Sequence, residues 1–297
     1  MAVFLNANRQ PGVRDAPLRS CKLASLARQA LIAEAELTPK PGLVDRRGSG
    51  AHTDLSLDLM RRSATVLEPY FASMAAVAEG RTPTRDLRAE LAAIGRDAER
   101  AMYKATAGAN SHKGAIWILG LLVAAAAQRD DLSATEIASA AGAIARFPDR
   151  ASLNVVTHGD IVRKRYGVAG ARGEACQGFP HVVQAGLPML RRQRKAGFRE
   201  DVCRLDALLE VMSRLDDTCL LYRGGIEALN VTKARAQAVL VAGGYGCPQG
   251  RIEAGGLDRE LIARRVSPGG SADLLAATIF LDAVERRQSV VSSDESI

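Results

Sequence analysis

The residues best able to do chemistry gather in one stretch, residues 38–54, with the sequence TPKPGLVDRRGSGAHTD. Its prolines and glycines are strong breakers of regular structure, so the stretch is predicted to be a loop. Its groups of the kinds that bind phosphate or move protons are Lys40, Asp45, Arg46, Arg47 and His52. We therefore predict that this loop forms part of an active site for an anionic, nucleotide-like substrate.

A second polar stretch is GANSHKG at residues 108–114. Its two glycines let the backbone approach a ligand closely, and the helix predicted to start at His112 would present free N–H groups at its positive end. Together with Lys113 this predicts a phosphate cradle, although the order of residues is not that of a Walker loop. The alternative is an ordinary helix start with a lysine facing solvent.

A third stretch holds the adjacent carboxylates Asp216 and Asp217, followed by LLYRGG at residues 220–225. Such a carboxylate pair in a loop can hold Mg²⁺, which prefers oxygen ligands and substrate phosphates. Alternatively, an aspartate caps the next helix. Arg223 is a candidate for bidentate phosphate binding.

The remaining polar groups lie in residues 157–160, 170–174 and 267–273. In SPGGSAD at 267–273 we expect Ser271 to cap a helix and Asp273 to stabilise its first turn. His181 is expected to be structural. The absence of HExxH, close histidine pairs and CxxC argues against a zinc site, and no GxSxG elbow is present.

The bulk composition describes a globular chain of 297 residues, with 47% hydrophobic residues and 4% aromatic ones. A core rich in Ala and Leu packs most naturally as helix on helix. The net charge is +7 and the pI about 9.4, which admits a polyanionic partner. Five scattered cysteines argue against a disulfide framework, and no membrane span or signal-peptide pattern is found. We expect a cytoplasmic protein.

Apolar spacing predicts one all-α domain of about ten helices over residues 18–288, with a flexible lead-in at 1–17 and a frayed tail at 289–297. The run from His112 to Gln128 is apolar on every side, so it should be a central, buried helix. Pro69 is expected to kink or break the helix around it. Thr84 and the capping box Ser133–Glu136 are expected to start two further helices. Residues 148–180 are predicted to be mostly irregular.

Taken together, these stretches resemble one known family. The runs TPKPGLVDRRGSGAHTD, GANSHKGAIWILGLL, THGDIVRKRYGVAGARGEACQGFP, LDDTCLLYRGG and SPGGSADLLA are similar, in the same order, to the triphosphoribosyl-dephospho-CoA synthases, over about residues 25–285. The resemblance implies an all-α enzyme that transfers the triphosphoribosyl group of ATP to the 2′-hydroxyl of 3′-dephospho-CoA and releases adenine. The product is the precursor of the prosthetic group of an acyl-carrier subunit.

Such a reaction displaces adenine from the ribose C1 through an oxocarbenium-like centre. It calls for a carboxylate beside the cation or the acceptor hydroxyl, a proton carrier, and cations with Mg²⁺ around an intact triphosphate. Our candidate catalytic residues are Asp45, Asp54, Glu174, Asp217, His52 and His112. Our candidates for holding ATP are Lys40, Arg46, Asn110, Lys113, His158, Arg172 and Arg223, with His158 a further possible proton carrier. Our candidate Mg²⁺ ligands are Asp45, Asp216 and Asp217.

The resemblance leaves the pathway open between malonate decarboxylase and citrate lyase. The malonate decarboxylase type is favoured by the absence of a fused nucleotidyl-transfer domain and by Cys219, where citrate-type relatives more often carry asparagine. We expect the product to pass to a separate holo-acyl-carrier-protein synthase, with no membrane partner. The alternatives are a related enzyme acting on a different nucleotide and, favoured only by the pI, a helical protein that binds nucleic acid with strong salt dependence.

Overall fold

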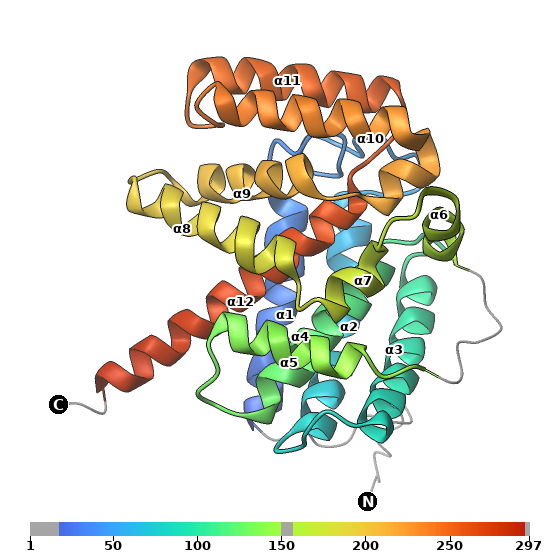
Figure 1. Ribbon diagram of the computed structural model, residues 1–297, viewed down its shortest axis with the longest axis vertical. Helices are drawn as coiled ribbons and strands as arrows, with labels where there is room; N and C mark the ends of the chain where they lie inside the picture. The colour runs from blue at the N-terminus through green and yellow to red at the C-terminus, as the bar shows by residue number, and fades with distance from the viewer. Residues whose placement is uncertain (1–17, 150–156, 295–297) are drawn as a thin grey trace, which may run out of the picture.

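The structure, a computed structural model, describes residues 18–149 and 157–294. These residues form twelve α-helices and one π-helical turn, with no strand, which confirms the all-α prediction (Figure 1). In chain order the elements are α1 (Leu18–Glu36), α2 (Leu57–Ala78), α3 (Arg85–Ala105), α4 (Lys113–Gln128), α5 (Ala134–Ala145), α6 (His158–Tyr166), α7 (Gly170–Cys176), η2 (Val182–Gly186), α8 (Leu187–Lys195), α9 (Glu200–Arg214), α10 (Thr218–Val241), α11 (Pro248–Ala263) and α12 (Gly269–Asp294). The expected lead-in at 1–17 and the last three residues of the expected tail lie outside the described residues.

Helix α4 is the buried centre of the first five helices. Twelve of its sixteen residues are buried, and it packs against α2, α3, α5 and α12. An all-apolar helix is stable in water only when neighbours cover every face, so the prediction of a central helix is confirmed. The start of α4 is thereby fixed inside the molecule, with His112 as its N-cap residue.

Helix α12 connects the two parts of the fold. Figure 1 shows it crossing the molecule diagonally, and it packs against α1 and α4 on one side and against α9 and η2 on the other. Its core face is formed by Leu274, Leu275 and Phe280, all at most 2% exposed. The first turn of α12 consequently lies where α1, α4 and α10 come together.

Helices α10 and α11 lie side by side at the top of Figure 1. Helix α10 begins at Thr218 and changes direction at Gly225, whose φ of 67° and ψ of −165° are not helical. Asp217 caps a helix that starts immediately after it and buries Leu220 and Leu221. Of the two alternatives for the acidic pair, the loop at 216–225 is therefore wrong and the helix cap is confirmed. Glycine permits the change of direction because it lacks a Cβ.

The prediction that residues 148–180 are mostly irregular is wrong, and the break expected as one alternative at Pro69 is absent. Residues 148–180 contain α6 and α7, and α6 is started by a capping box between Thr157 and Asp160, a pattern with aspartate in place of the usual glutamate. Helix α2 also continues through Pro69 without a break, since the helix on both sides is packed against α1, α3 and α4.

The predicted helix starts were partly right. Thr84 caps α3, and Ser133 with Glu136 forms the expected capping box of α5. Ser271 is not a cap, because α12 already begins at Gly269. The hydroxyl of Ser271 instead donates a hydrogen bond to Asp217. Among the described helices, none is long and apolar enough to cross a membrane.

The loop between α1 and α2 folds back on itself. An isolated bridge pairs Asp45 with Gly48, and the N–H of Ala51 donates to the carbonyl of Gly42 over 3.1 Å. Gly50 has a φ of 57°, and a Cβ added there would lie 2.4 Å from the carbonyl oxygen of Leu43. This close approach of two backbone segments sets the shape of the loop.

We expect Gly50→Ala to destabilise the protein more than Gly80→Ala. Both glycines have a positive φ, but a Cβ at Gly80 meets nothing within 4 Å. The Gly80 change should therefore lower the free energy of unfolding only by the left-handed strain of about 1–2 kcal/mol, and the Gly50 change by about 1–3 kcal/mol more because backbone must move. Urea denaturation of both variants measures this, and equal losses would contradict it.

Candidate active site

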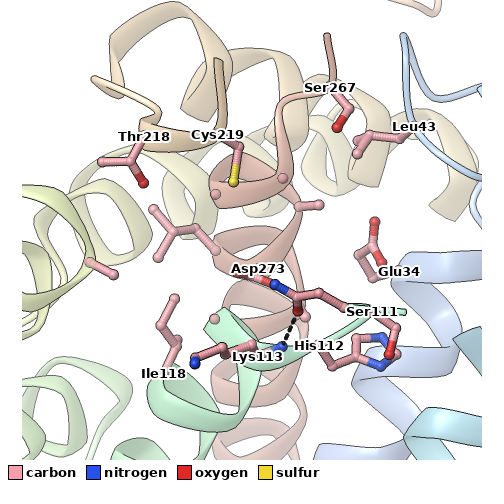
Figure 2. Close-up of a pocket in the computed structure, with 18 of the residues that line it drawn as sticks. Glu34, Leu43, Ser111, His112, Lys113, Ile118, Thr218, Cys219, Ser267 and Asp273 are labelled. Atoms are coloured by element: carbon pink, nitrogen blue, oxygen red, sulfur yellow. Dashed lines mark hydrogen bonds between the residues drawn. The ribbon is translucent and has the colours of Figure 1, made fainter. Parts of the chain in front are cut away.

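One pocket collects the polar stretches that the sequence scatters along the chain. It has a cavity of about 220 Å³ and is lined from α1, from the loop after α1, and from the starts of α4, α7, α10 and α12 (Figure 2). The predicted site residues on its wall are Lys40, His52, Asn110, His112, Lys113, Glu174, Asp216 and Arg223. The stretches 38–54, 108–114 and 216–225 therefore do meet at a single site.

Asp45 holds the loop together and does not line the pocket. Its carboxylate is 3% exposed and accepts hydrogen bonds from the N–H groups of Lys40, over 2.9 Å, and Arg47, over 2.7 Å, and from the Arg47 guanidinium. Asp258 on α11 fixes the same loop, since it accepts from the N–H of Gly42 and from Arg47. With its oxygens occupied by these donors, Asp45 has the contacts of a positioning residue.

Lys40 forms a buried ion pair with Glu34. The lysine is 1% exposed, the glutamate on α1 is 3% exposed, and the Nζ–Oε1 distance is 2.5 Å. Taking both charges out of water is unfavourable unless the pair is kept together. The pair thus fixes the loop against α1 at the pocket wall.

His112 is a neutral, fully enclosed imidazole. Burial, and then the positive charge of Lys40, lower the pKa of His112 to about 3. Its Nδ1 lies 2.7 Å from the hydroxyl of Ser63, which in turn accepts from Ser111. The ring contacts its surroundings through Nδ1, on the side of Ser63. Its Nε2 is buried with no hydrogen-bond partner in the described protein.

Asp217 ties the starts of α10 and α12 to each other. It is 1% exposed and accepts from the N–H of Cys219 over 2.9 Å, from the N–H of Gly270 over 3.3 Å, and from both the N–H and the hydroxyl of Ser271 over 2.8 and 2.9 Å. Burial raises the pKa of Asp217, and the hydrogen bonds from Ser271 oppose that rise. Like Asp45, it does not line the pocket.

Asp273, the fifth residue of α12, does line the pocket. Burial, followed by the negative charges of Glu34 and Asp217, raises the pKa of the Asp273 carboxyl well above its usual value. Burial likewise raises the pKa of the neighbouring Cys219 thiol, so that side chain is a neutral, apolar part of the wall. The sequence predicted that Asp273 stabilises the first turn of its helix. That role alone does not explain why its carboxylate lines a cavity.

The more exposed part of the pocket wall carries the positively charged side chains of Lys113 and Arg223. Helices α4, α10 and α12 all begin there. The first N–H groups of α10 and α12 donate to Asp217, and the N–H of Lys113 in α4 donates to Asn110. Lys113 is 3.1 Å from Glu99, whereas the hydrogen bond of Arg223 within the described residues is one of 3.3 Å to Ser267. The positive dipole ends of these helices favour anions, so this side of the pocket is suited to phosphate.

Two other predicted carboxylates on the wall, Glu174 and Asp216, have defined partners, whereas Nδ1 of His52 has no hydrogen-bond partner among the described residues. Glu174 accepts from the N–H of His181 and lies 2.7 Å from its Nδ1. Asp216 is paired with Lys233 at 2.8 Å. Burial, and next the charge of Arg223, lower the pKa of His52. His181, expected to be structural, is thus the partner of a pocket carboxylate.

Four further predicted residues are absent from the pocket wall. Arg46 reaches away to Glu36, and Asp54 is largely exposed beside His52, 3.6 Å from its ring. His158 stacks on the ring of Tyr222 with centroids 4.0 Å apart, and Arg172 is exposed on α7.

Sequence reasoning missed Glu34 and Ser63 and gave Asp273 a lesser role. Glu34 lies on the buried face of α1 with Ala27, Ala30 and Leu31, at the three- and four-residue spacing of a core stripe. A carboxylate within such a stripe is the signal that could have identified it. The positions of Ser63 and Asp258 depend on tertiary packing and leave no such mark.

The carboxylates predicted to bind Mg²⁺ do not form a complete metal site, but they fit an ion that is also bound by substrate phosphates. Among the described residues there is no group of three or more His, Cys, Asp or Glu side chains that could hold a metal. Asp45 and Asp217, two of the three predicted ligands, give their oxygens to N–H donors, whereas Asp216 borders the pocket and is half-exposed. Mg²⁺ in nucleotide sites commonly takes one or two carboxylates and completes its shell with phosphates and water.

An enclosed pocket with a few convergent polar groups is the usual form of a small-molecule site, so this pocket is the candidate active site. Residues 20–291 match the family described as "ATP:dephospho-CoA triphosphoribosyl transferase", and the chain belongs to this family. No solved structure matches the chain.

Relatives agree in name over nearly the full length. A protein of Stutzerimonas stutzeri (strain A1501) is 54% identical over 91% of this chain and 93% of its own. A protein of Pseudomonas aeruginosa (strain PAO1) is 52% identical over 95% of this chain and 96% of its own. One of Azotobacter vinelandii (strain DJ) is 50% identical over 96% of this chain and 97% of its own. Each is named "Probable 2-(5''-triphosphoribosyl)-3'-dephosphocoenzyme-A synthase".

We expect His112 to make the protein sensitive to acid. Its pKa in the folded state, about 3, lies below the value of about 6.5 in an unfolded chain. The unfolded state therefore binds the extra proton, and stability falls as the pH decreases from about 6.5 toward 3. In His112→Gln this dependence should be weaker by about 2 kcal/mol between pH 6.5 and 4.5.

Urea denaturation at several pH values measures this dependence. His158→Gln, on an exposed side chain of α6, is the matched control and should follow the unaltered protein. Parallel stability curves for His112→Gln and the unaltered protein would contradict the assignment.

Proposed function

We propose that this enzyme transfers the 5-triphosphoribosyl group of ATP to the 2′-hydroxyl of 3′-dephospho-CoA and releases adenine. Family membership supports the reaction class. The observation that carries the proposal is one pocket in which three helix starts, Lys113 and Arg223 adjoin the buried groups Glu34, Lys40 and His112 and the carboxylate of Asp273. Such a site separates a phosphate-binding side from a side suited to reaction at a sugar carbon.

On the phosphate-binding side, Arg223 and Lys113 provide positive charge and the start of α4 provides N–H donors. Among the residues that the structure describes, Arg223 has one hydrogen bond, to Ser267, and no ion pair, so it can turn to a ligand without breaking one. Asp216 would hold Mg²⁺ together with the phosphates. The ion, when bound, neutralises charge on the triphosphate and so helps to keep it in one conformation.

On the sugar side, displacement of adenine leaves positive charge on the ribose C1 and ring oxygen. Carboxylates within a low-dielectric pocket stabilise such a cation far better than they would in water. The cavity of about 220 Å³ is smaller than the roughly 300–1,000 Å³ typical of sites that enclose a whole ligand. It has room for the reacting ribose while other parts of both substrates extend beyond it.

His112 is proposed to act as a hydrogen-bond donor and not as a proton carrier. With a pKa of about 3 it is neutral at physiological pH, and its Nε2 has no partner within the described protein. In this proposal Ser63 donates its hydroxyl hydrogen to Nδ1, which places the ring hydrogen on Nε2. A ribose hydroxyl or a ring nitrogen of adenine would satisfy it. Burial of an unsatisfied donor is unfavourable by about 1–3 kcal/mol, which a bound substrate would recover.

We further propose that the product serves the acyl-carrier subunit of malonate decarboxylase. The support is Cys219, which lies on the pocket wall at a position where citrate-type relatives more often carry asparagine. Since both carrier systems use the same precursor, assays with purified enzyme do not separate them. Deleting the gene should abolish growth on malonate and spare growth on citrate; the opposite pattern would overturn this assignment.

We expect purified protein to release free adenine only when ATP, Mg²⁺ and 3′-dephospho-CoA are all present. Chromatography measures adenine, and mass spectrometry should detect a conjugate carrying the triphosphoribosyl group. Absence of adenine under all conditions would overturn the proposed function. A salt-dependent affinity for DNA or RNA without adenine release would favour the nucleic-acid alternative.

We expect Arg223→Gln to raise the KM for ATP about tenfold to a hundredfold, the value of one charge-assisted hydrogen bond, with kcat changed less. Arg46→Gln provides the contrast, because Arg46 is paired with Glu36 and does not line the pocket. It should leave the KM within about threefold. Steady-state adenine release measures both, and a larger effect at Arg46 would favour the sequence-based assignment over the geometric one.

A further inference from the structure

Of the four carboxylates on the pocket wall, Asp273 differs from the rest in having no partner. Glu34 is held by Lys40, Glu174 by His181 and Asp216 by Lys233. Asp273 makes no hydrogen bond or ion pair with any residue that the structure describes, although it borders the cavity. Its oxygens are therefore available to a ligand.

The backbone of α4 leaves room for this carboxylate. A Cβ added at Gly114 would lie 2.1 Å from Oδ2 of Asp273, so only glycine at position 114 lets the carboxylate occupy its place. Figure 2 shows Asp273 in the middle of the pocket, where α12 passes the start of α4, with Glu34 on the other side of the cavity. Two elements far apart in the sequence are thus shaped around one unpaired acid.

The groups that face Asp273 come from every element around it. Glu34 on α1 and Asp217 before α10 are negative, and Lys40 is positive but already paired with Glu34. His112 is neutral, and Cys219 is a neutral thiol. The carboxylate therefore lies in an enclosed, electrostatically unfavourable place, which raises the pKa of Asp273 well above its usual value. A carboxylate so placed is a stronger base than one in water.

We propose that Asp273 is the catalytic base that takes the proton from the acceptor 2′-hydroxyl as this oxygen attacks C1 of the ATP ribose. The proposal rests on the function proposed above. The new bond joins the acceptor oxygen to C1, the C1–N9 bond breaks, and its electron pair leaves with adenine. Adenine takes up one proton from water and Asp273 later returns its proton to water, so the reaction consumes and releases none overall.

The test compares Asp273→Asn with the unaltered enzyme in steady-state adenine release. Loss of a general base lowers kcat by about 10²–10⁴-fold, and we expect that loss with both KM values within about threefold. The activity of the unaltered enzyme should rise with pH through the pKa of Asp273 and then level off. In the variant, residual activity should show no such rise.

A matched control is Asp282→Asn, on the same helix. Asp282 is 6% exposed, is bound to Arg194 and does not line the cavity. Its replacement should keep kcat within about twofold, whatever it loses in thermal stability. Asp273→Asn with near-normal kcat, or with unchanged kcat and a raised KM, would overturn the proposal and leave the proposed function intact, because the unaltered enzyme would still release adenine.

Two other variants keep the test decisive if Asp273→Asn fails to fold. Gly114→Ala should displace the carboxylate and lower kcat at least about tenfold while the pocket keeps its charges. Asp273→Ala, which removes the base and leaves space, should regain activity with added formate, and this gain should grow with pH. Normal kcat in Gly114→Ala, or no gain with formate in a folded Asp273→Ala, would overturn the assignment.

Discussion

The arrangement of the pocket depends on the carboxylate of Asp217, which receives donors from the first turns of two helices at once. Each helix start leaves N–H groups without intrahelical partners, and these must be satisfied wherever they are buried. One side chain does this for α10, through Cys219, and for α12, through Gly270 and Ser271. Because both helices are anchored to the same atoms, Arg223 on α10 and Asp273 on α12 are placed on one cavity. A charge buried to this degree is tolerable only because four donors surround it.

The loop after α1 is held by the same kind of interaction. Asp45 binds the loop's own N–H groups, and the pair of Glu34 and Lys40 connects it to α1. Replacing a buried ion pair with apolar side chains is often neutral or stabilising, so stability alone gives little reason for Lys40 to be there. Its charge instead acts on its surroundings: it helps to keep His112 neutral and balances one of the four carboxylates on the pocket wall.

The sequence is informative wherever polar chemistry interrupts an Ala- and Leu-rich pattern. Proline, glycine and histidine in residues 38–54 and 108–114 identify two walls of the pocket, and helical spacing gives the all-α class. The start of α10 was misjudged because an acidic pair suggests a loop equally well, and the contact that consumes the oxygens of Asp217 joins it to residue 271, far along the chain. Glu34 and Asp273 were not predicted as site residues because both lie inside helices, where a charged side chain is expected to belong to a solvent-exposed helix face or a helix start. What distinguishes them is the packing of other elements around them, which spacing does not reveal.

The two kinds of carboxylate have opposite electrostatic consequences. Asp45 and Asp217 are surrounded by donors, so their charge is compensated and is not available to a ligand. At Asp273 no donor compensates the charge, and Glu34 and Asp217 add to the repulsion. Repulsion of that kind is relieved by a proton, or by a substrate that brings a hydroxyl hydrogen and develops positive charge at a sugar carbon. A triphosphate held at Arg223 and Lys113 would place the attached ribose toward that unbalanced charge, so that the same binding energy that holds the phosphates brings the reacting carbon to the acid.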